Sequence, residues 1–214
     1  VLLLADKPKL KFLKYQKEEA MKMRGRVVCL VSPSGVGKTS YAKRLVKKYN
    51  FVLPTVVTTR QQRSDDSENY QYISESIFFE MVRSGSFLEW DRYSNYYYGT
   101  LAQSVKEIID SEHPSGVILD LTPVGCQKIK KLMPSAVVIA LLPDNHVWLF
   151  ERLISRNSQP PKEIQMRTKL LNSYLDEVNS LTCKKVYASF SPDSWDNTFE
   201  AIEKIVLEFE TIRG

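Results

Sequence analysis

The sequence predicts an α/β fold of three layers, in which helices cover both faces of a parallel central sheet. Short apolar runs alternate with helical patterns along the chain. Continuous apolar runs are typical of parallel strands, because these are buried on both faces. A glycine-containing loop joins the first run to a helix, as in phosphate-binding α/β domains. Strands are expected at residues 26–32, 52–58, 116–121, 136–142 and 185–189.

Helical patterns fill most of the intervals between these strands. Ser74 is expected to cap a helix whose buried face carries Ile77, Phe78, Met81 and Val82. The other helices are expected at residues 9–23, 38–48, 101–111, 125–132, 146–156, 163–181 and 198–213. We expect residues 1–25 to form an N-terminal helical appendage and residues 26–214 to form one domain.

Composition narrows the class of protein. The 214 residues are 43% apolar and 26% charged, and no apolar run approaches the length of a membrane span. Cys29, Cys126 and Cys183 are an odd number at wide spacings, so we expect free thiols and a cytoplasmic location. The net charge of +5 comes largely from basic residues before residue 27. That stretch is either a solvated helix or a partner-binding arm, and no nucleic-acid motif accompanies it.

The segment Ser32-Pro-Ser-Gly-Val-Gly-Lys-Thr39 has the pattern of a phosphate-binding loop, or P-loop. Its glycines let the backbone wrap around phosphates, while the following helix N-terminus supplies positive potential. Lys38 is expected to reach the β- and γ-phosphates of a nucleotide, and the Thr39 hydroxyl to ligate Mg²⁺. Ser32 stands where the motif usually has its first glycine. The expected phosphate-binding residues are Ser34, Gly35, Val36, Gly37, Lys38, Thr39 and Ser40.

A second anion site is expected in residues of about 58–100, a segment rich in tyrosine, serine and charge that interrupts the strand–helix alternation. Arg60 and Arg63 lie three residues apart after a predicted strand, followed by Tyr70. Guanidinium groups bind phosphate through two hydrogen bonds, and phenol groups add neutral donors. Glu89 suits a base edge with two N–H donors, which guanine has and adenine lacks. The segment is therefore expected to be an inserted substrate-binding lobe.

These motifs resemble the GMP-binding signature of guanylate kinases. The resemblance rests on Thr-Thr-Arg-x-x-Arg, Tyr-x-Tyr, Phe-Leu-Glu-Trp and Tyr-Tyr-Gly-Thr, and it extends from about residue 26 to the C-terminal helix. It implies that the GMP phosphate is held by Arg60, Arg63, Tyr70 and Tyr98. It also implies that Glu89 and Thr100 bind the guanine base, and that Asp120 lies near the metal and the phosphates.

The resemblance also implies a helical lid over residues of about 152–168. Arg152 and Arg156 are four residues apart on one predicted helix and therefore share a face, and Arg167 follows beyond a Pro-Pro loop. The alternative for any one of them is a solvated basic helix face. In guanylate kinases such arginines close over the nucleotide phosphates, so all three are expected to be catalytic together with Lys38 and Arg60.

Several positions depart from the family pattern. Thr122 replaces the second acid that usually follows the acid ending the strand, and Val56 replaces a serine that helps to hold guanine. The loop containing residues 65–68 is about two residues shorter than usual and reads Asp-Asp-Ser-Glu. The Asn-Asp pair that the family carries near position 189 is absent.

The sequence is compatible with two hypotheses of function. In the first, the chain is a kinase that converts ATP and GMP to ADP and GDP with Mg²⁺, although Val56 leaves another nucleoside monophosphate possible as acceptor. In the second, it is a guanylate kinase-like domain of a scaffold protein, which binds protein partners or phosphopeptides through the former GMP site. Domains of the second kind typically lose the P-loop lysine and the lid arginines, which this chain retains.

Overall fold

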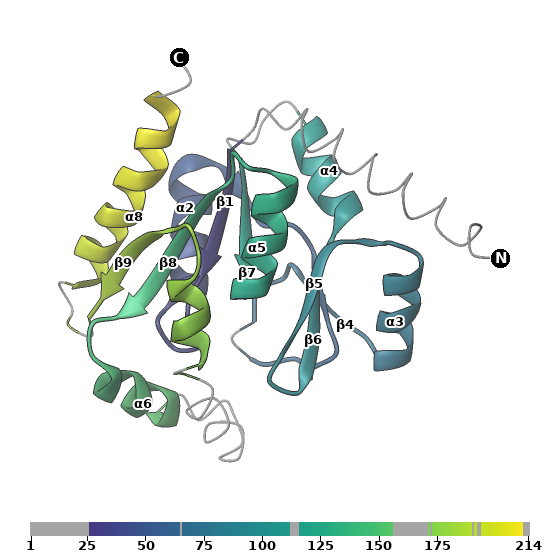
Figure 1. Ribbon diagram of the computed structural model, residues 1–214, viewed down its shortest axis with the longest axis horizontal. Helices are drawn as coiled ribbons and strands as arrows, with labels where there is room; N and C mark the ends of the chain where they lie inside the picture. The colour runs from purple at the N-terminus through teal and green to yellow at the C-terminus, as the bar shows by residue number, and fades with distance from the viewer. Residues whose placement is uncertain are drawn as a thin grey trace.

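The computed structural model describes residues 26–64, 66–111, 116–155, 171, 173–189, 191 and 194–211. The predicted N-terminal helix at residues 9–23 and most of the predicted lid lie outside these ranges. The described part contains two sheets, a parallel sheet that carries the phosphate loop and a smaller mixed sheet beside it (Figure 1).

The first sheet has five parallel strands in the order β2-β7-β1-β8-β9. They are β2 (Phe51–Val52), β7 (Gly116–Leu121), β1 (Arg26–Val31), β8 (Val137–Pro143) and β9 (Lys184–Ala188). The three central strands match their predicted positions within a residue. Strands β1 and β7 are neighbours, and their register pairs Leu30 with Asp120 and Val31 with Leu121. Both strands therefore end at the same edge of the sheet.

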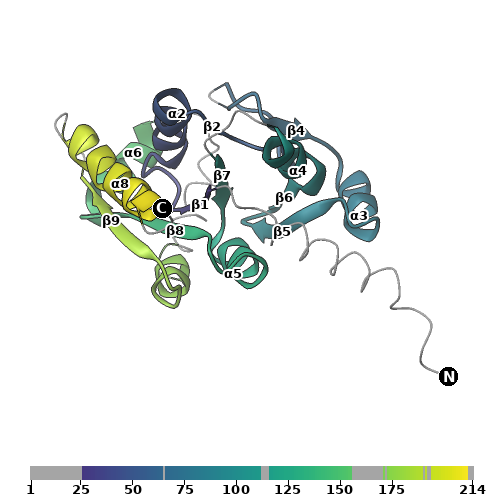
Figure 2. The same ribbon diagram turned by 90° about the horizontal axis from the view of Figure 1, so that it is seen from above.

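Alternating side chains of the central strands build a core on each face of this sheet. On β1, Val28 and Leu30 pack on one face, while Val27, Cys29 and Val31 pack on the other. The first face is covered by α2 (Lys38–Tyr49) and α8 (Ser194–Thr211), and the second by α5 (Pro123–Leu132) and α4 (Ala102–Asp110). Figure 2 shows α2 and α8 on the opposite side of the sheet from α5. The three predicted layers are confirmed.

The second sheet has the strand order β4-β3-β6-β5 and forms the inserted lobe. Its strands are β3 (Val56–Thr58), β4 (Tyr70–Tyr72), β5 (Phe87–Tyr93) and β6 (Tyr96–Leu101). Helix α3 (Glu75–Arg83) packs on one face through Phe78, with the predicted cap Ser74 accepting a hydrogen bond from the backbone of Ile77. The opposite face is left for the cavity described below.

One predicted strand is wrong. Residues 52–58 were expected to form a single strand, but β2 and β3 belong to different sheets. Pro54 lies between them; it has no N–H group to donate and its φ is fixed, so it interrupts the ladder. The chain crosses from the parallel sheet to the lobe at this point.

The remaining helices differ from expectation mainly at their ends. Helix α5 begins two residues earlier than predicted, because Thr122 caps it and Pro123 fits its first turn. Helix α8 begins at Ser194, four residues early, since Trp195 in its first turn packs on Tyr41 of α2 with ring centroids 4.8 Å apart. Helix α6 spans His146–Ser155, and residues 173–179 are helical within the predicted 163–181. Within the described ranges, no helix is long and apolar enough to span a membrane.

Candidate active site

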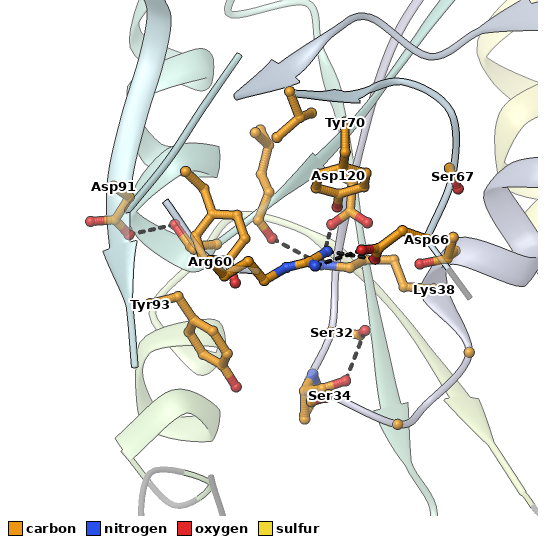
Figure 3. A pocket seen from close by; sticks show the side chains of 18 of the residues that line it. Ser32, Ser34, Lys38, Arg60, Asp66, Ser67, Tyr70, Asp91, Tyr93 and Asp120 are labelled. Atoms are coloured by element: carbon orange, nitrogen blue, oxygen red, sulfur yellow. Dashed lines mark hydrogen bonds and ion pairs between the residues drawn. The ribbon is translucent and has the colours of Figure 1, made fainter. Parts of the chain in front are cut away.

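A cavity of about 360 Å³ lies where the ends of β1 and β7 face the lobe. Ligands of parallel α/β sheets bind at this carboxyl edge of the strands. Its walls include most of the residues predicted to bind phosphate or base, namely Ser34, Gly35, Gly37, Lys38, Thr39, Ser40, Arg60, Arg63, Tyr70, Glu89, Tyr98, Thr100, Asp120 and Arg152. The residues of the two predicted sites, which are far apart in the sequence, therefore line one cavity (Figure 3).

The phosphate loop needs glycine where the chain turns. Gly37 has a φ of 105°, and a Cβ there would come within 2.5 Å of the Trp195 ring. Gly35 has a φ of 95°. Between them, the Val36 side chain lies in the core, so only the backbone of this predicted residue is left to bind phosphate. At the loop entrance, the buried Tyr174 hydroxyl donates to the Ser32 carbonyl over 2.7 Å.

Lys38 extends across the end of the sheet toward β7. Its ammonium group forms an ion pair with Asp120 and donates to the Leu121 carbonyl over 3.4 Å. The parallel register of β1 and β7 produces this contact, because it places Asp120 beside the strand that leads into the loop. The side chains of Lys38 and Asp120 are 18% and 17% exposed, so a ligand in the cavity can reach both.

Arg60 is held by the carboxylate of Asp66, a residue that the sequence motifs did not predict as part of the site. Its guanidinium donates to both oxygens of Asp66 over 2.6 and 2.5 Å, and to the Gln61 carbonyl over 2.9 Å. Asp66 also accepts from the Arg63 backbone at 2.7 Å and from the Tyr72 hydroxyl at 2.6 Å. These bonds use three of the five N–H groups of Arg60, which leaves two for a ligand. Asp66 thus fixes Arg60 in the cavity.

The lobe sheet presents alternate residues to the cavity. Glu89 pairs with Thr100 across β5 and β6, and Val56 of β3 pairs with Thr100 from the other side. The Thr100 hydroxyl donates to Glu89 over 2.7 Å. Burial raises the pKa of Glu89 to about 7, partly opposed by this hydrogen bond. Gly99 leaves room for Phe87, whose ring would lie 2.6 Å from a Cβ at that position.

Some site residues were missed and others are not described. Asp66, Asp91, Tyr93, Lys43 and Tyr174 line the cavity but were not predicted as site residues. Asp91 lies two residues after the predicted Glu89, and strand alternation would have suggested it. Of the predicted lid arginines, Arg152 lines the cavity and its guanidinium lies 5.2 Å from the Trp195 ring centroid. Arg156 and Arg167 fall outside the described residues.

The Arg60–Asp66 contact predicts an acid-sensitive contribution to stability. Burial favours the neutral acid, but the hydrogen bonds from Arg60, Tyr72 and the Arg63 backbone prevail and lower the pKa of Asp66 to about 2. A carboxyl group with a lowered folded pKa stabilises the protein above its unfolded pKa and loses this effect as the pH falls. The contribution is about 2 kcal/mol at neutral pH, and about half is lost by pH 3.

Urea unfolding of the native protein and Asp66→Asn at pH 5 and pH 3 measures this effect. The difference in unfolding free energy between the two proteins should shrink by about 1 kcal/mol at pH 3. Tyr72→Phe removes one donor to Asp66 and should give a smaller change. A difference that stays constant with pH would contradict the lowered pKa.

The parallel sheet, the phosphate loop and the cavity beside it define a P-loop nucleotide-binding protein. The family model described as guanylate kinase matches residues 24–207, which is most of the chain. The chain belongs to the guanylate kinase family.

Individual relatives agree with this assignment. The chain is 31% identical over 191 residues to a guanylate kinase of Caldanaerobacter subterraneus, covering 88% of this chain and 89% of that protein. It is 33% identical over 148 residues to a guanylate kinase of Thermotoga maritima, covering 68% and 70%. The crystal structure of guanylate kinase from Anaplasma phagocytophilum has a similar fold, with a TM-score of 0.62 at 20% identity over 86% of this chain and 85% of that one.

Proposed function

We propose that the chain transfers the γ-phosphoryl group of ATP to the phosphate of GMP and forms ADP and GDP. One observation carries the proposal: the phosphate loop and the Arg60, Tyr70 and Glu89 face of the lobe line the same cavity. A nucleotide in each half would bring two phosphate groups together between Lys38 and Arg60. The names of the relatives support GMP as acceptor, and the phosphate loop with Lys38 supports a nucleoside triphosphate as donor.

The chemistry requires positioning and charge neutralisation more than covalent catalysis. An oxygen of the GMP phosphate forms the new bond to the γ-phosphorus, while the bond from the γ-phosphorus to the bridging oxygen breaks and leaves ADP. Lys38 and Arg152 would neutralise the charge that spreads over the transferring group. Arg60 and Arg63 would orient the acceptor phosphate, with Tyr70 and Tyr98 as neutral donors. Arg156 and Arg167 stay predicted members of this set.

The donor set of the cavity fits a magnesium ion. The Thr39 hydroxyl and the Asp120 carboxylate line the same wall, and Mg²⁺ is usually held by one or two protein oxygens together with phosphates and water. Bound there, it would neutralise phosphate charge. In the described structure Asp120 is paired with Lys38, so both would adjust when a nucleotide binds.

We also place this reaction in the cytoplasm. Cys29, Cys126 and Cys183 are all free thiols, and the first two are buried. Free thiols are usual in a reducing compartment, which supports this location.

An acceptor screen tests the proposal. ADP release should be measured with ATP, Mg²⁺ and each of GMP, dGMP, AMP, CMP and UMP. We expect turnover that depends on GMP or dGMP. Equal rates with AMP or UMP would contradict the choice of base, and no turnover with any acceptor would contradict the kinase. In the latter case, binding of phosphopeptides to the lobe would be the next measurement.

The phosphate-binding role of Arg60 can be measured separately from turnover. Arg60→Ala should weaken GMP binding about 10- to 100-fold, the effect of losing a hydrogen bond between charged groups. Calorimetric titration with GMP gives the affinity. Arg92, an exposed arginine on β5, provides the control Arg92→Ala, for which we expect no change.

A double variant separates two causes of weaker binding. Arg60→Ala leaves Asp66 without its main partner, and its charge could itself repel phosphate. If the phosphate contact matters, Arg60→Ala with Asp66→Asn stays weak. If binding returns to the native value, repulsion by Asp66 explains the loss and Arg60 does not bind the phosphate.

A further inference from the structure

A second carboxylate, Asp91, faces the base-binding part of the cavity. It lies on β5 two residues after Glu89, and residues two apart on a strand share a face. Both side chains line the cavity, together with Thr122 from the end of β7. Figure 3 shows Asp91 at one side of the site, joined to a neighbouring side chain by a hydrogen bond.

Thr122 fixes the orientation of this carboxylate. Its hydroxyl donates to Asp91 Oδ2 over 2.6 Å and accepts from the Gly125 backbone over 3.0 Å. Because the Gly125 N–H can only donate, the single hydroxyl proton of Thr122 is directed to Asp91. Asp91 is therefore held as an acceptor. Within the described residues this is the one hydrogen bond that its carboxylate accepts, which leaves lone pairs on both oxygens for a ligand.

Glu89 and Asp91 are arranged in the same way. Each has one oxygen held by a threonine hydroxyl, Thr100 for Glu89 at 2.7 Å and Thr122 for Asp91 at 2.6 Å. The two acids are close enough for the charge of Asp91 to add to the effect of burial on the pKa of Glu89. Two neighbouring acceptors of like charge call for a ligand edge with more than one N–H donor, since each donor relieves one carboxylate.

Guanine has that edge, with N1–H beside a 2-amino group, whereas hypoxanthine has N1–H alone and adenine has no N–H at N1. We propose that Asp91, oriented by Thr122, is a specificity-determining residue that accepts a hydrogen bond from the 2-amino group of the acceptor guanine. This inference rests on the proposed use of GMP. The acid expected at position 122 is then replaced by one supplied from β5, with Thr122 acting as its positioning residue.

A comparison of GMP with IMP tests this assignment, because the two differ at the 2-amino group. Affinities for both are measured by calorimetry, and kcat/KM for both with ATP and Mg²⁺. In Asp91→Asn we expect binding and kcat/KM for GMP to fall about 10- to 100-fold, with a much smaller change for IMP. The preference for GMP over IMP should fall by nearly the same factor.

Two substitutions at position 122 separate orientation from helix capping. Thr122→Val removes the hydroxyl and should also reduce the preference for GMP over IMP. Thr122→Ser keeps a hydroxyl that can accept from Gly125 and donate to Asp91, so it should restore the preference. Asp110→Asn, on the exposed side of α4, is the matched control and should leave both ligands unchanged.

The outcomes distinguish this inference from the proposed function. Equal losses for GMP and IMP in Asp91→Asn would overturn the inference, because Asp91 would then only hold the lobe against α5. A native protein that binds GMP no better than IMP would overturn it as well. A third outcome is that the protein shows no turnover but binds GMP more tightly than IMP, and that Asp91→Asn abolishes this difference in affinity. That outcome would contradict the kinase and support the contact between Asp91 and the base.

Discussion

Replacing Lys38 by alanine is expected to lower kcat for phosphoryl transfer at least about 10²-fold, the usual effect of removing one preorganised charge-stabilising group. Lys38 is the cationic side chain at the first turn of α2, and it crosses the cavity to reach Asp120 and Leu121. Its charge would act on the transferring phosphoryl group more strongly than on the bound substrates. The loss should therefore appear in kcat more than in KM for GMP.

The fold should survive this change. Lys38 is partly exposed, and Asp120 at 17% exposure can be hydrated once its partner is removed. Equal far-ultraviolet circular dichroism and a similar melting temperature would exclude unfolding as the cause. Lys47→Ala, at an exposed position near the end of the same helix, is the matched control and should keep native turnover. Turnover in Lys38→Ala close to the native rate would contradict the mechanism.

The parallel sheet and the phosphate loop could be predicted because their signals are local. β1, the loop and α2 are contiguous in the sequence, and continuous apolar runs mark the buried strands. β1 and α2 therefore end within a residue of their expected positions. The strands of the lobe gave no such signal. β5 and β6 are rich in tyrosine and charge, and the pairing of a mixed sheet depends on residues far apart in the sequence.

In the site, likewise, the sequence indicated which residue types take part but not which residues they contact. Motifs predicted Lys38, Arg60 and Glu89, since these side chains have chemistry that suits phosphate or guanine. They did not predict which neighbour holds each one. Thr122 and Asp91 are 31 residues apart and Tyr174 and Ser32 are 142 apart, so only the folded chain brings them together. A departure from a family pattern, such as Thr122, can be interpreted only when its new partner is known.

Glu89→Gln is expected to weaken GMP binding and to stabilise the protein at the same time. As a carboxylate, Glu89 can accept both N–H groups of guanine, whereas glutamine replaces one oxygen with a donor. We expect kcat/KM for GMP to fall about 10- to 100-fold. In the native protein, KM for GMP should rise as the pH falls below about 7, because the pKa of Glu89 is about 7 and the protonated form loses an acceptor. Glu107→Gln, on α4 outside the cavity, is the control for activity.

The stability effect has the opposite sign and its own pH dependence. A folded pKa raised above the unfolded value favours the protonated folded protein, so this contribution is present at low pH and is lost as the pH rises through about 7. Glutamine carries no charge, so Glu89→Gln avoids the free-energy cost of ionising a buried acid at high pH. Its gain in unfolding free energy should therefore be about 2–3 kcal/mol larger at pH 8 than at pH 5. Urea unfolding at both pH values measures the gain. A buried acid that costs stability at neutral pH, yet is required for GMP binding, is held there for its ligand. If Glu89→Gln bound GMP as well as the native protein, Glu89 would have no part in recognising the base.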